Sequence, residues 1–324
     1  MGGKIYNTKR TNTKEYLDIS LDAKGKVSQF KNEVSIPDSF KNKISWGDVD
    51  CLTTLPLIDK EDILRVFNIP NENFSQNSNV YSILYRDFQV DIIHVPEEDF
   101  ESSFEYYRGG DTGNLIGRLF HNIGLKFGHR GLLCPVKLSQ EESLGEIVVS
   151  KNIRETLEFI VLDYEQWRCG FEDEPEMWEW ISKSPYFNKS FYQLENLNHQ
   201  NRKRNVVRPG YRRFLEWTNS REFDNNYIPS LNKTEHIWRA ALHFGFDWIN
   251  QAKPLIDEYR RDKEIRGIFN GSEVSKITSL TGAELGAILK SYKESLGDWK
   301  SFFYSRTKEE MIEHFKNWYD RHQI

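Results

Sequence analysis

The pattern of apolar and polar positions changes character about halfway along the chain. Up to residue 150, short runs rich in β-branched and aromatic residues alternate with turn residues, which predicts strands mixed with a few helices. From about Ile153 onward the spacing of apolar residues is helical, and prolines separate the segments. We therefore expect an α+β fold with two domains, a mixed-sheet domain at residues 1–150 and an all-α domain at residues 151–324.

The same pattern predicts individual elements in the first domain. Strands are predicted at residues 44–55 and 80–95, with a helix at about 59–68 between them. The second strand region is expected to fold as a hairpin across the turn at Arg86-Asp87. Residues 1–35 fit a helix or a hairpin equally well.

The segment after the hairpin is first glycine-rich and then apolar. Residues 109–114 precede apolar residues at helical spacing, so a helix is expected to begin near Asp111. Two more strands are expected further along, at Gly131–Val136 and Gly145–Val149.

Length and composition are those of an ordinary globular protein. The chain has 324 residues, of which 38% are hydrophobic and 29% charged. No apolar run approaches the roughly 20 residues of a membrane-spanning helix, and the N-terminus lacks the apolar segment of a signal peptide. The three cysteines, Cys51, Cys134 and Cys169, fit neither a disulfide framework nor a zinc pattern. We expect a cytoplasmic protein without a membrane partner.

Charge is distributed unevenly along the chain. The formal net charge is −5, yet residues 199–213, here called the basic tract, contain cations and no acidic residue. Such a tract favours contact with nucleic-acid phosphates, and an aromatic residue within it could stack on a base. The alternative is a solvated face that pairs with the acidic stretch before it. The candidate nucleic-acid contacts are Arg202, Lys203, Arg204, Arg208, Tyr211, Arg212 and Arg213.

The most informative chemistry lies in the two predicted strands of the first domain. Asp48 and Asp50 are one residue apart, so on a strand they project from the same face, about 7 Å apart. Asp91 lies between Val90 and Ile92, where a carboxylate is costly without a cation or hydrogen bonds. A chance pair in a solvated loop is the alternative, but apolar residues flank the acids. The three acids form the ligand set of a two-Mg²⁺ site for phosphoryl transfer.

These residues resemble the DNA-polymerase-beta-type nucleotidyltransferase superfamily, which includes CCA-adding enzymes and poly(A) polymerases. Gly47-Asp48-Val49-Asp50 and Val90-Asp91 match its acidic motifs. Gly2 and Gly3 match the glycine pair whose backbone approaches the nucleotide, with Lys4 as a neighbouring cation, although the stretch before the acids is longer than in most members. The Met-Gly-Gly start also resembles viral and phage-type members, which implies the host cytoplasm as location.

A second segment extends the resemblance. The glycine-rich stretch from Tyr106 to Gly117 is similar to the one that follows the third acid in the phage-type members, where a helix N-terminus meets the nucleotide phosphates. A loop with a helix cap is the alternative. The nucleotide-binding candidates that this resemblance implies are Gly47, Arg108, Gly110, Asp111, Asn114 and Arg118.

The resemblance implies a nucleotidyltransferase palm domain followed by a helical domain that binds the acceptor. The expected enzyme transfers a nucleoside monophosphate from an NTP or dNTP to a hydroxyl, with Mg²⁺ or Mn²⁺ on Asp48, Asp50 and Asp91. The basic tract favours the 3′ end of a nucleic acid as acceptor, RNA or tRNA ahead of DNA. The alternatives are single-nucleotide transfer to a protein or small molecule, and a non-catalytic nucleic-acid-binding palm.

Overall fold

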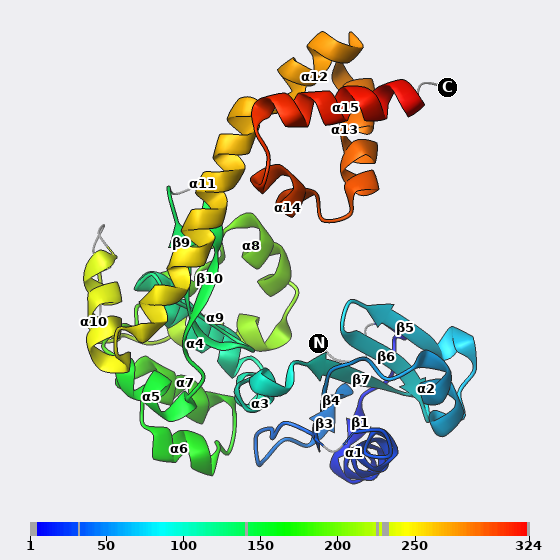
Figure 1. Cartoon of the computed structure of the whole chain (residues 1–324). Helices are drawn as coiled ribbons and strands as arrows, with labels where there is room; N and C mark the ends of the chain where they lie inside the picture. Colours follow the sequence, from blue (N-terminus) through cyan, green and yellow to red (C-terminus); the bar gives the residue numbers. More distant parts are fainter. Residues whose placement is uncertain (1–4, 32, 140–141, 225–226, 229–232, 323–324) are drawn as a thin grey trace. The chain divides into compact units, whose positions relative to one another are not determined.

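The computed structural model describes residues 5–31, 33–139, 142–224, 227–228 and 233–322 (Figure 1). It has a mixed α/β fold, with a mixed sheet in the N-terminal part and helices in the C-terminal part. Two compact units can be distinguished, residues 1–135 with 146–249, and residues 136–145 with 250–324. The division into functional domains at 1–150 and 151–324 stays a prediction.

Strands are concentrated in the first half of the chain, as expected. They are β1 (Thr11–Asn12), β2 (Val34–Ser35), β3 (Ser45–Trp46), β4 (Asp48–Thr54), β5 (Phe74–Asn77), β6 (Val80–Tyr85), β7 (Phe88–Val95), β8 (Lys126–Gly128), β9 (Gly131–Lys137) and β10 (Ser143–Ser150).

Helices occur in both halves and dominate the second. The α-helices are α1 (Thr13–Val27), α2 (Lys60–Phe67), α3 (Phe100–Tyr107), α4 (Thr112–Asn122), α5 (Ile153–Phe159), α6 (Tyr164–Cys169), α7 (Glu174–Ser182), α8 (His199–Asn205), α9 (Pro209–Asn219), α10 (Thr234–Phe244), α11 (Ala252–Ile268), α12 (Gly271–Thr278), α13 (Gly282–Leu296), α14 (Trp299–Tyr304) and α15 (Lys308–His322). The 3₁₀ helices are η1 (Asn71–Asn73), η2 (Glu97–Asp99), η3 (Lys189–Tyr192), η4 (Leu194–Asn196) and η5 (Asp247–Gln251).

The largest sheet has five strands in the order β2-β4-β7-β6-β5. The hairpin predicted across Arg86-Asp87 is confirmed as β6 and β7, and both turn residues have positive φ. The strand predicted at residues 44–55 is confirmed, but a bend at Gly47 divides it into β3 and β4. Strands β4 and β7 pair in parallel, because the chain between them passes through α2, β5 and β6.

One face of this sheet is covered by α1 and α2. Odd-numbered residues of β4, such as Val49 and Cys51, and the even-numbered Val90 of β7 are fully buried there. The helix predicted at about 59–68 is confirmed, and Asp59 caps it by accepting a hydrogen bond from the Glu61 backbone N–H. Within residues 1–35, for which the sequence fitted a helix or a hairpin, the structure has helix α1. Asn12 caps this helix by accepting a hydrogen bond from the Glu15 backbone N–H.

The opposite face is divided into an apolar end and an acidic end. Leu52, Ile93 and Val95 form a small buried cluster, against which Phe104 and Tyr107 of α3 pack. Even-numbered positions of β4 and odd-numbered positions of β7 share this face, since side chains alternate along a strand. The same rows therefore continue from the apolar cluster into the three aspartates.

The rest of the first unit is helical around an aromatic core. Trp167 stacks on Trp180, with ring centroids 5.6 Å apart, and Tyr192 meets Phe214 edge to face at 4.9 Å. The helical character expected after Ile153 is confirmed. In the second unit, helices α12 to α15 enclose a separate core that includes Tyr292.

Candidate metal centre

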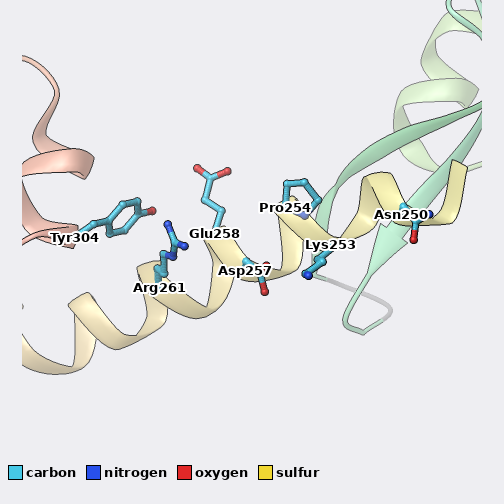
Figure 2. Close-up of a pocket in the computed structure, with 7 residues that line it drawn as sticks. All are labelled: Asn250, Lys253, Pro254, Asp257, Glu258, Arg261 and Tyr304. Carbon is cyan, nitrogen blue, oxygen red and sulfur yellow. The ribbon is translucent and has the colours of Figure 1, made fainter. Parts of the chain in front are cut away.

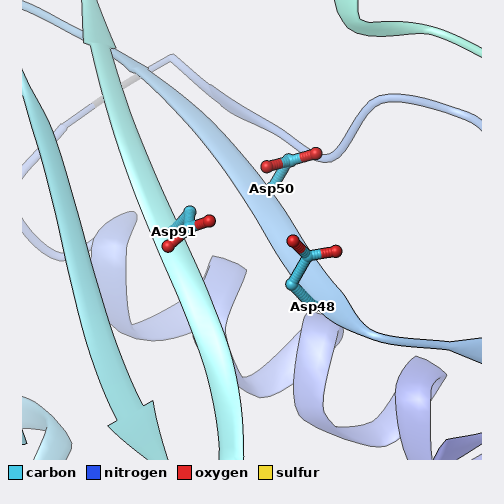
Figure 3. A group of neighbouring side chains, drawn as sticks. All are labelled: Asp48, Asp50 and Asp91. Carbon is cyan, nitrogen blue, oxygen red and sulfur yellow. The ribbon is translucent and has the colours of Figure 1, made fainter. Parts of the chain in front are cut away.

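Three carboxylates lie together on adjacent strands of the five-stranded sheet. Asp48 and Asp50 project from β4 and Asp91 from β7, and the parallel register sets Asp50 directly beside Asp91. Figure 3 shows the three side chains on one face of the two strands. Each residue offers an oxygen, and these oxygens all lie within 4.8 Å of one another. The grouping that the sequence predicted is therefore present in the fold.

Burial and mutual repulsion make this cluster electrostatically strained. Burial raises the pKa of Asp48 and of Asp91 above the usual aspartate range. For Asp50, burial together with the charges of Asp48 and Asp91 raises the pKa to about 7. A divalent cation would offset this repulsion. Carboxylate oxygens are the ligands that Mg²⁺ prefers, and ligand atoms on opposite sides of this ion are about 4 Å apart, close to the observed spread. The residues fit a magnesium centre.

Asp91 is held by two polar neighbours on the same sheet. The side-chain NH₂ of Gln89 donates to both carboxylate oxygens of Asp91, at 3.0 Å each. The Ser82 side chain, opposite Asp91 on β6, also hydrogen-bonds to it. These bonds lower the pKa of Asp91 but do not outweigh burial. Among the described residues, hydrogen bonds and not an ion pair hold this carboxylate in place.

A half-buried lysine accompanies the acids, and the sequence analysis did not identify it. The Lys43 ammonium lies 3.9 Å above the Trp46 ring, which stacks on Tyr16 with a centroid distance of 3.6 Å. Burial lowers the pKa of Lys43, while the charges of Asp48 and Asp50 act in the opposite direction. Within the described ranges no ion pair within 4.0 Å involves Lys43, so its charge remains available to an anion beside the acids. The spacing of Lys43 and Trp46 was the only sequence signal, and it is weak.

The glycine-rich segment has the left-handed backbone that glycine permits. Gly109 and Gly110 have φ values of +67° and +66°, and α4 begins at Thr112, next to the predicted start at Asp111. Asp111 forms an ion pair with Arg208 of the basic tract. Arg108 lies 3.2 Å from Asp38 and 3.7 Å from Glu105, and donates to the Arg168 carbonyl. These side chains connect elements of the fold, and their nucleotide contacts stay predictions.

The other nucleotide-binding candidates are distributed differently. Asn114 donates to the Asn205 side chain at 3.4 Å, and the buried Arg118 donates to the Phe191 carbonyl at 3.1 Å. Both therefore contact the helical part of the first unit and not the acids. Gly47 is buried at the bend immediately before Asp48. Gly2, Gly3 and Lys4 lie outside the described residues.

The basic tract divides into inward and outward side chains. Tyr211 is fully buried and donates to the Tyr192 carbonyl at 2.6 Å, so its ring cannot stack on a base as the sequence suggested. Arg202 donates to three backbone carbonyls between residues 194 and 197, and Arg213 forms two 2.7 Å bonds with Glu174. The tract thus includes several fold-stabilising contacts.

Three cations of the tract face solvent. Lys203, Arg204 and Arg212 are exposed, and none of them forms an ion pair within the part of the chain that the structure describes. Burial raises the pKa of Tyr107 to about 12, and the charge of Asp50 adds to this rise. Arg204 is close enough to Tyr107 for its charge to oppose the rise. Tyr107 therefore lies in the electric field of both the tract and the acids.

A cavity lies in the second unit, and the described residues that line it include none of the predicted site residues. It has a volume of about 560 Å³ and lies along α11 beside Tyr304 (Figure 2). Two of its charged residues are paired, since Asp257 lies 3.8 Å from Arg260 and Glu258 forms an ion pair with Lys300. This cavity has no grouping of chemistry comparable to the three aspartates.

Comparisons with known proteins add no identification. No protein-family model matches the chain, and no curated protein is significantly similar to it. Among the helices in the described ranges, none combines the length and the apolar character needed to cross a membrane.

Proposed function

We propose that the protein is a metal-dependent nucleotidyltransferase. It would transfer a nucleoside monophosphate from an NTP or dNTP to a hydroxyl, with the 3′ end of RNA favoured over DNA as acceptor. The observation that supports this most directly is the grouping of Asp48, Asp50 and Asp91 on two parallel strands, with their oxygens within 4.8 Å. Acids presented in this way suit phosphoryl transfer, which needs positioning and charge stabilisation more than covalent chemistry.

Each residue has a defined task in this proposal. Asp48, Asp50 and Asp91 would hold Mg²⁺ or Mn²⁺, which when bound would make the acceptor hydroxyl more acidic and offset charge on the triphosphate. Lys43 would contribute a positive charge for the phosphates from the β4 side of the cluster. The acceptor hydroxyl would give up its proton to solvent, its oxygen would bond to the α-phosphorus, and the bond from the α-phosphorus to the bridging oxygen would break, so that pyrophosphate leaves.

The exposed cations support a nucleic-acid acceptor over a small molecule. Lys203, Arg204 and Arg212 offer charges to a phosphate backbone. Arg204 and Asp50 both influence the pKa of Tyr107, which supports an acceptor path from this surface to the acids. A strand held by the three cations would thus have its end near the metal centre.

Incubation with Mg²⁺, each labelled nucleoside triphosphate and RNA, tRNA, primed DNA or no polymer tests the proposal. A ladder of products indicates polymerisation and a single addition indicates transfer of one nucleotide. Asp50→Ala should lose at least about a hundredfold of the activity, because a metal ligand is removed. Asp87→Asn, on the exposed hairpin turn, serves as control, because the positive φ of Asp87 suits asparagine. Full activity of Asp50→Ala, or no incorporation under any condition, would overturn the assignment.

A further inference from the structure

A buried amide completes the acidic face of the sheet. The parallel register sets Gln89 beside Asp48 and Asp91 beside Asp50, so these four residues form two neighbouring pairs on one face. Gln89 is only 3% exposed. It is the position in this group that supplies hydrogen-bond donors, whereas the other three supply carboxylates.

The orientation of the Gln89 amide is determined from both ends. Its NH₂ donates to both oxygens of Asp91, and its oxygen accepts a 3.1 Å hydrogen bond from the Ile5 backbone N–H. A rotated amide would turn its oxygen toward the carboxylate and its NH₂ toward the Ile5 N–H, so both contacts would become repulsive. The backbone of residue 5 therefore selects the orientation that holds Asp91.

Tyr6, the residue after Ile5, contacts Ser82, the second residue that holds Asp91. The Tyr6 hydroxyl donates to the Ser82 carbonyl at 2.9 Å. The side chain of Ser82 is the other group that hydrogen-bonds to Asp91. Both residues that hold the third carboxylate thus also hold the segment at residues 5–6.

We propose that Gln89 is a positioning residue that connects residues 5–6 to Asp91. Through this connection, ordering of residues 5–6 and the affinity of the acids for metal are coupled. The inference rests on the proposed metal centre. A carboxylate fixed by a cation keeps its acceptor oxygens in place for the Gln89 NH₂, and the oriented amide in turn holds Ile5. Coupling between two sites is reciprocal, so a fastened segment favours metal binding as much as bound metal fastens the segment.

The test uses the full chain with Gln89→Met, which keeps the side-chain length and removes both amide contacts. Gln76→Met on β5 is the matched control, because Gln76 is exposed and donates to the nearby Ser78 carbonyl. Mn²⁺ affinity is measured by electron paramagnetic resonance. Hydrogen exchange is followed at Ile5 and Tyr6 with and without Mn²⁺.

We expect Gln89→Met to weaken Mn²⁺ binding by about tenfold or more, as is usual for partners of metal ligands. It should also speed exchange at residues 5–6 and abolish the slowing of exchange that Mn²⁺ causes in the unmodified chain. Gln76→Met should change none of these. Unaltered Mn²⁺ affinity in Gln89→Met, or equal protection of residues 5–6 by Mn²⁺, would overturn the proposal.

Two further outcomes separate this inference from the proposed function. If the unmodified chain binds no Mn²⁺, the proposed metal centre fails and the affinity part of the inference fails with it. Hydrogen exchange in the metal-free proteins still tests whether Gln89 holds residues 5–6, since unchanged exchange at these residues in Gln89→Met would refute that connection. If Gln89→Met does not fold, Tyr6→Phe is tested instead, because it loosens the segment at residues 5–6 without altering the sheet. Tyr6→Phe should weaken Mn²⁺ binding about threefold through the same coupling. An unchanged Mn²⁺ affinity in Tyr6→Phe would count against the proposal.

Discussion

At the scale of single residues, a carboxyl group with a raised pKa makes stability depend on pH. Asp50 has a pKa of about 7 in the folded chain, against about 3.9 when unfolded. Between these pH values the folded state binds more protons, so the stability of the metal-free protein should fall as pH rises from about 4 to about 7. At pH 8, Asp50→Asn should be the more stable protein by up to about 4 kcal/mol.

Denaturant unfolding at pH 5 and pH 8, with chelator present, measures this difference. Asp87→Asn is the control, because Asp87 is exposed and its positive φ suits asparagine. Added Mg²⁺ should stabilise the unmodified chain at pH 8 and leave Asp50→Asn unchanged. A stability advantage of Asp50→Asn that is equal at both pH values contradicts the prediction.

Lys43 gives a second prediction at this scale. Lys43→Met removes the charge above Trp46, and we expect the KM for the nucleoside triphosphate to rise by about tenfold, the usual effect of losing a hydrogen bond to a charged group. Lys41→Met is the control, since Lys41 is exposed and pairs with Glu172 at 2.8 Å. Steady-state kinetics at saturating acceptor measures both variants. Equal KM values for the two variants would remove Lys43 from the nucleotide site.

The acids could be predicted from sequence because their signal is local. Side chains two apart on a strand share a face whatever the tertiary structure, and this brought Asp48 and Asp50 together. Lys43 could not be predicted, because its position above Trp46 depends on how the chain turns before β3. Tyr211 was misjudged for a related reason, since α9 directs this residue inward to Tyr192.

At the scale of elements, the crossing of α3 and α4 depends on one glycine. A Cβ on Gly113 would lie 2.5 Å from the Tyr106 carbonyl oxygen, a backbone atom that cannot move alone. Gly113→Ala should therefore destabilise the protein by about 1–3 kcal/mol. Gly117→Ala, in the same helix, meets only an ordinary 3.5 Å contact and should stabilise it by up to about 1 kcal/mol.

Denaturant unfolding of both glycine variants measures this pair of opposite effects. Equal stabilities would show that α3 and α4 shift apart at little cost.

The elements themselves were largely predictable, and their pairing was not. A capping residue and helical spacing located α2, and turn residues located the β6–β7 hairpin, because these signals lie within a few residues of one another. The parallel pairing of β4 with β7 joins segments about 40 residues apart and depends on burial of both faces. Short strands such as β2 carry too few residues to show a period.

At the scale of the whole molecule, the prediction concerns acceptor binding. Replacing Lys203, Arg204 and Arg212 together with glutamine should weaken RNA binding. The slope of the logarithm of the binding constant against the logarithm of salt concentration should become shallower by about one for each lost phosphate contact. A charge-matched control replaces Lys14, Lys24 and Arg65, exposed cations of α1 and α2. Binding measured across a series of salt concentrations compares them. An identical salt slope for both triple variants would place the acceptor elsewhere.

Organisation at this scale was the least accessible to sequence reasoning. Residues 136–145 group with residues 250–324, although more than 100 residues separate them. The Glu142 side chain, for example, hydrogen-bonds to Tyr259 of α11. Periodicity describes neighbours along the chain and carries no information on such a pairing.

The parallel pairing of β4 with β7 also determines where the chain tolerates changes in length. The connection between these strands, residues 55–87, reaches the acidic face through Ser82 of β6. Its surface turns lie outside the pairing of β4 with β7, so insertions in those turns leave the three acids in register. One residue inserted between Phe88 and Asp91 would instead turn the third acid toward α1 and α2. Over evolutionary time, homologous chains should therefore vary in length at the connection around residues 68–73 and keep the spacing within β7 fixed.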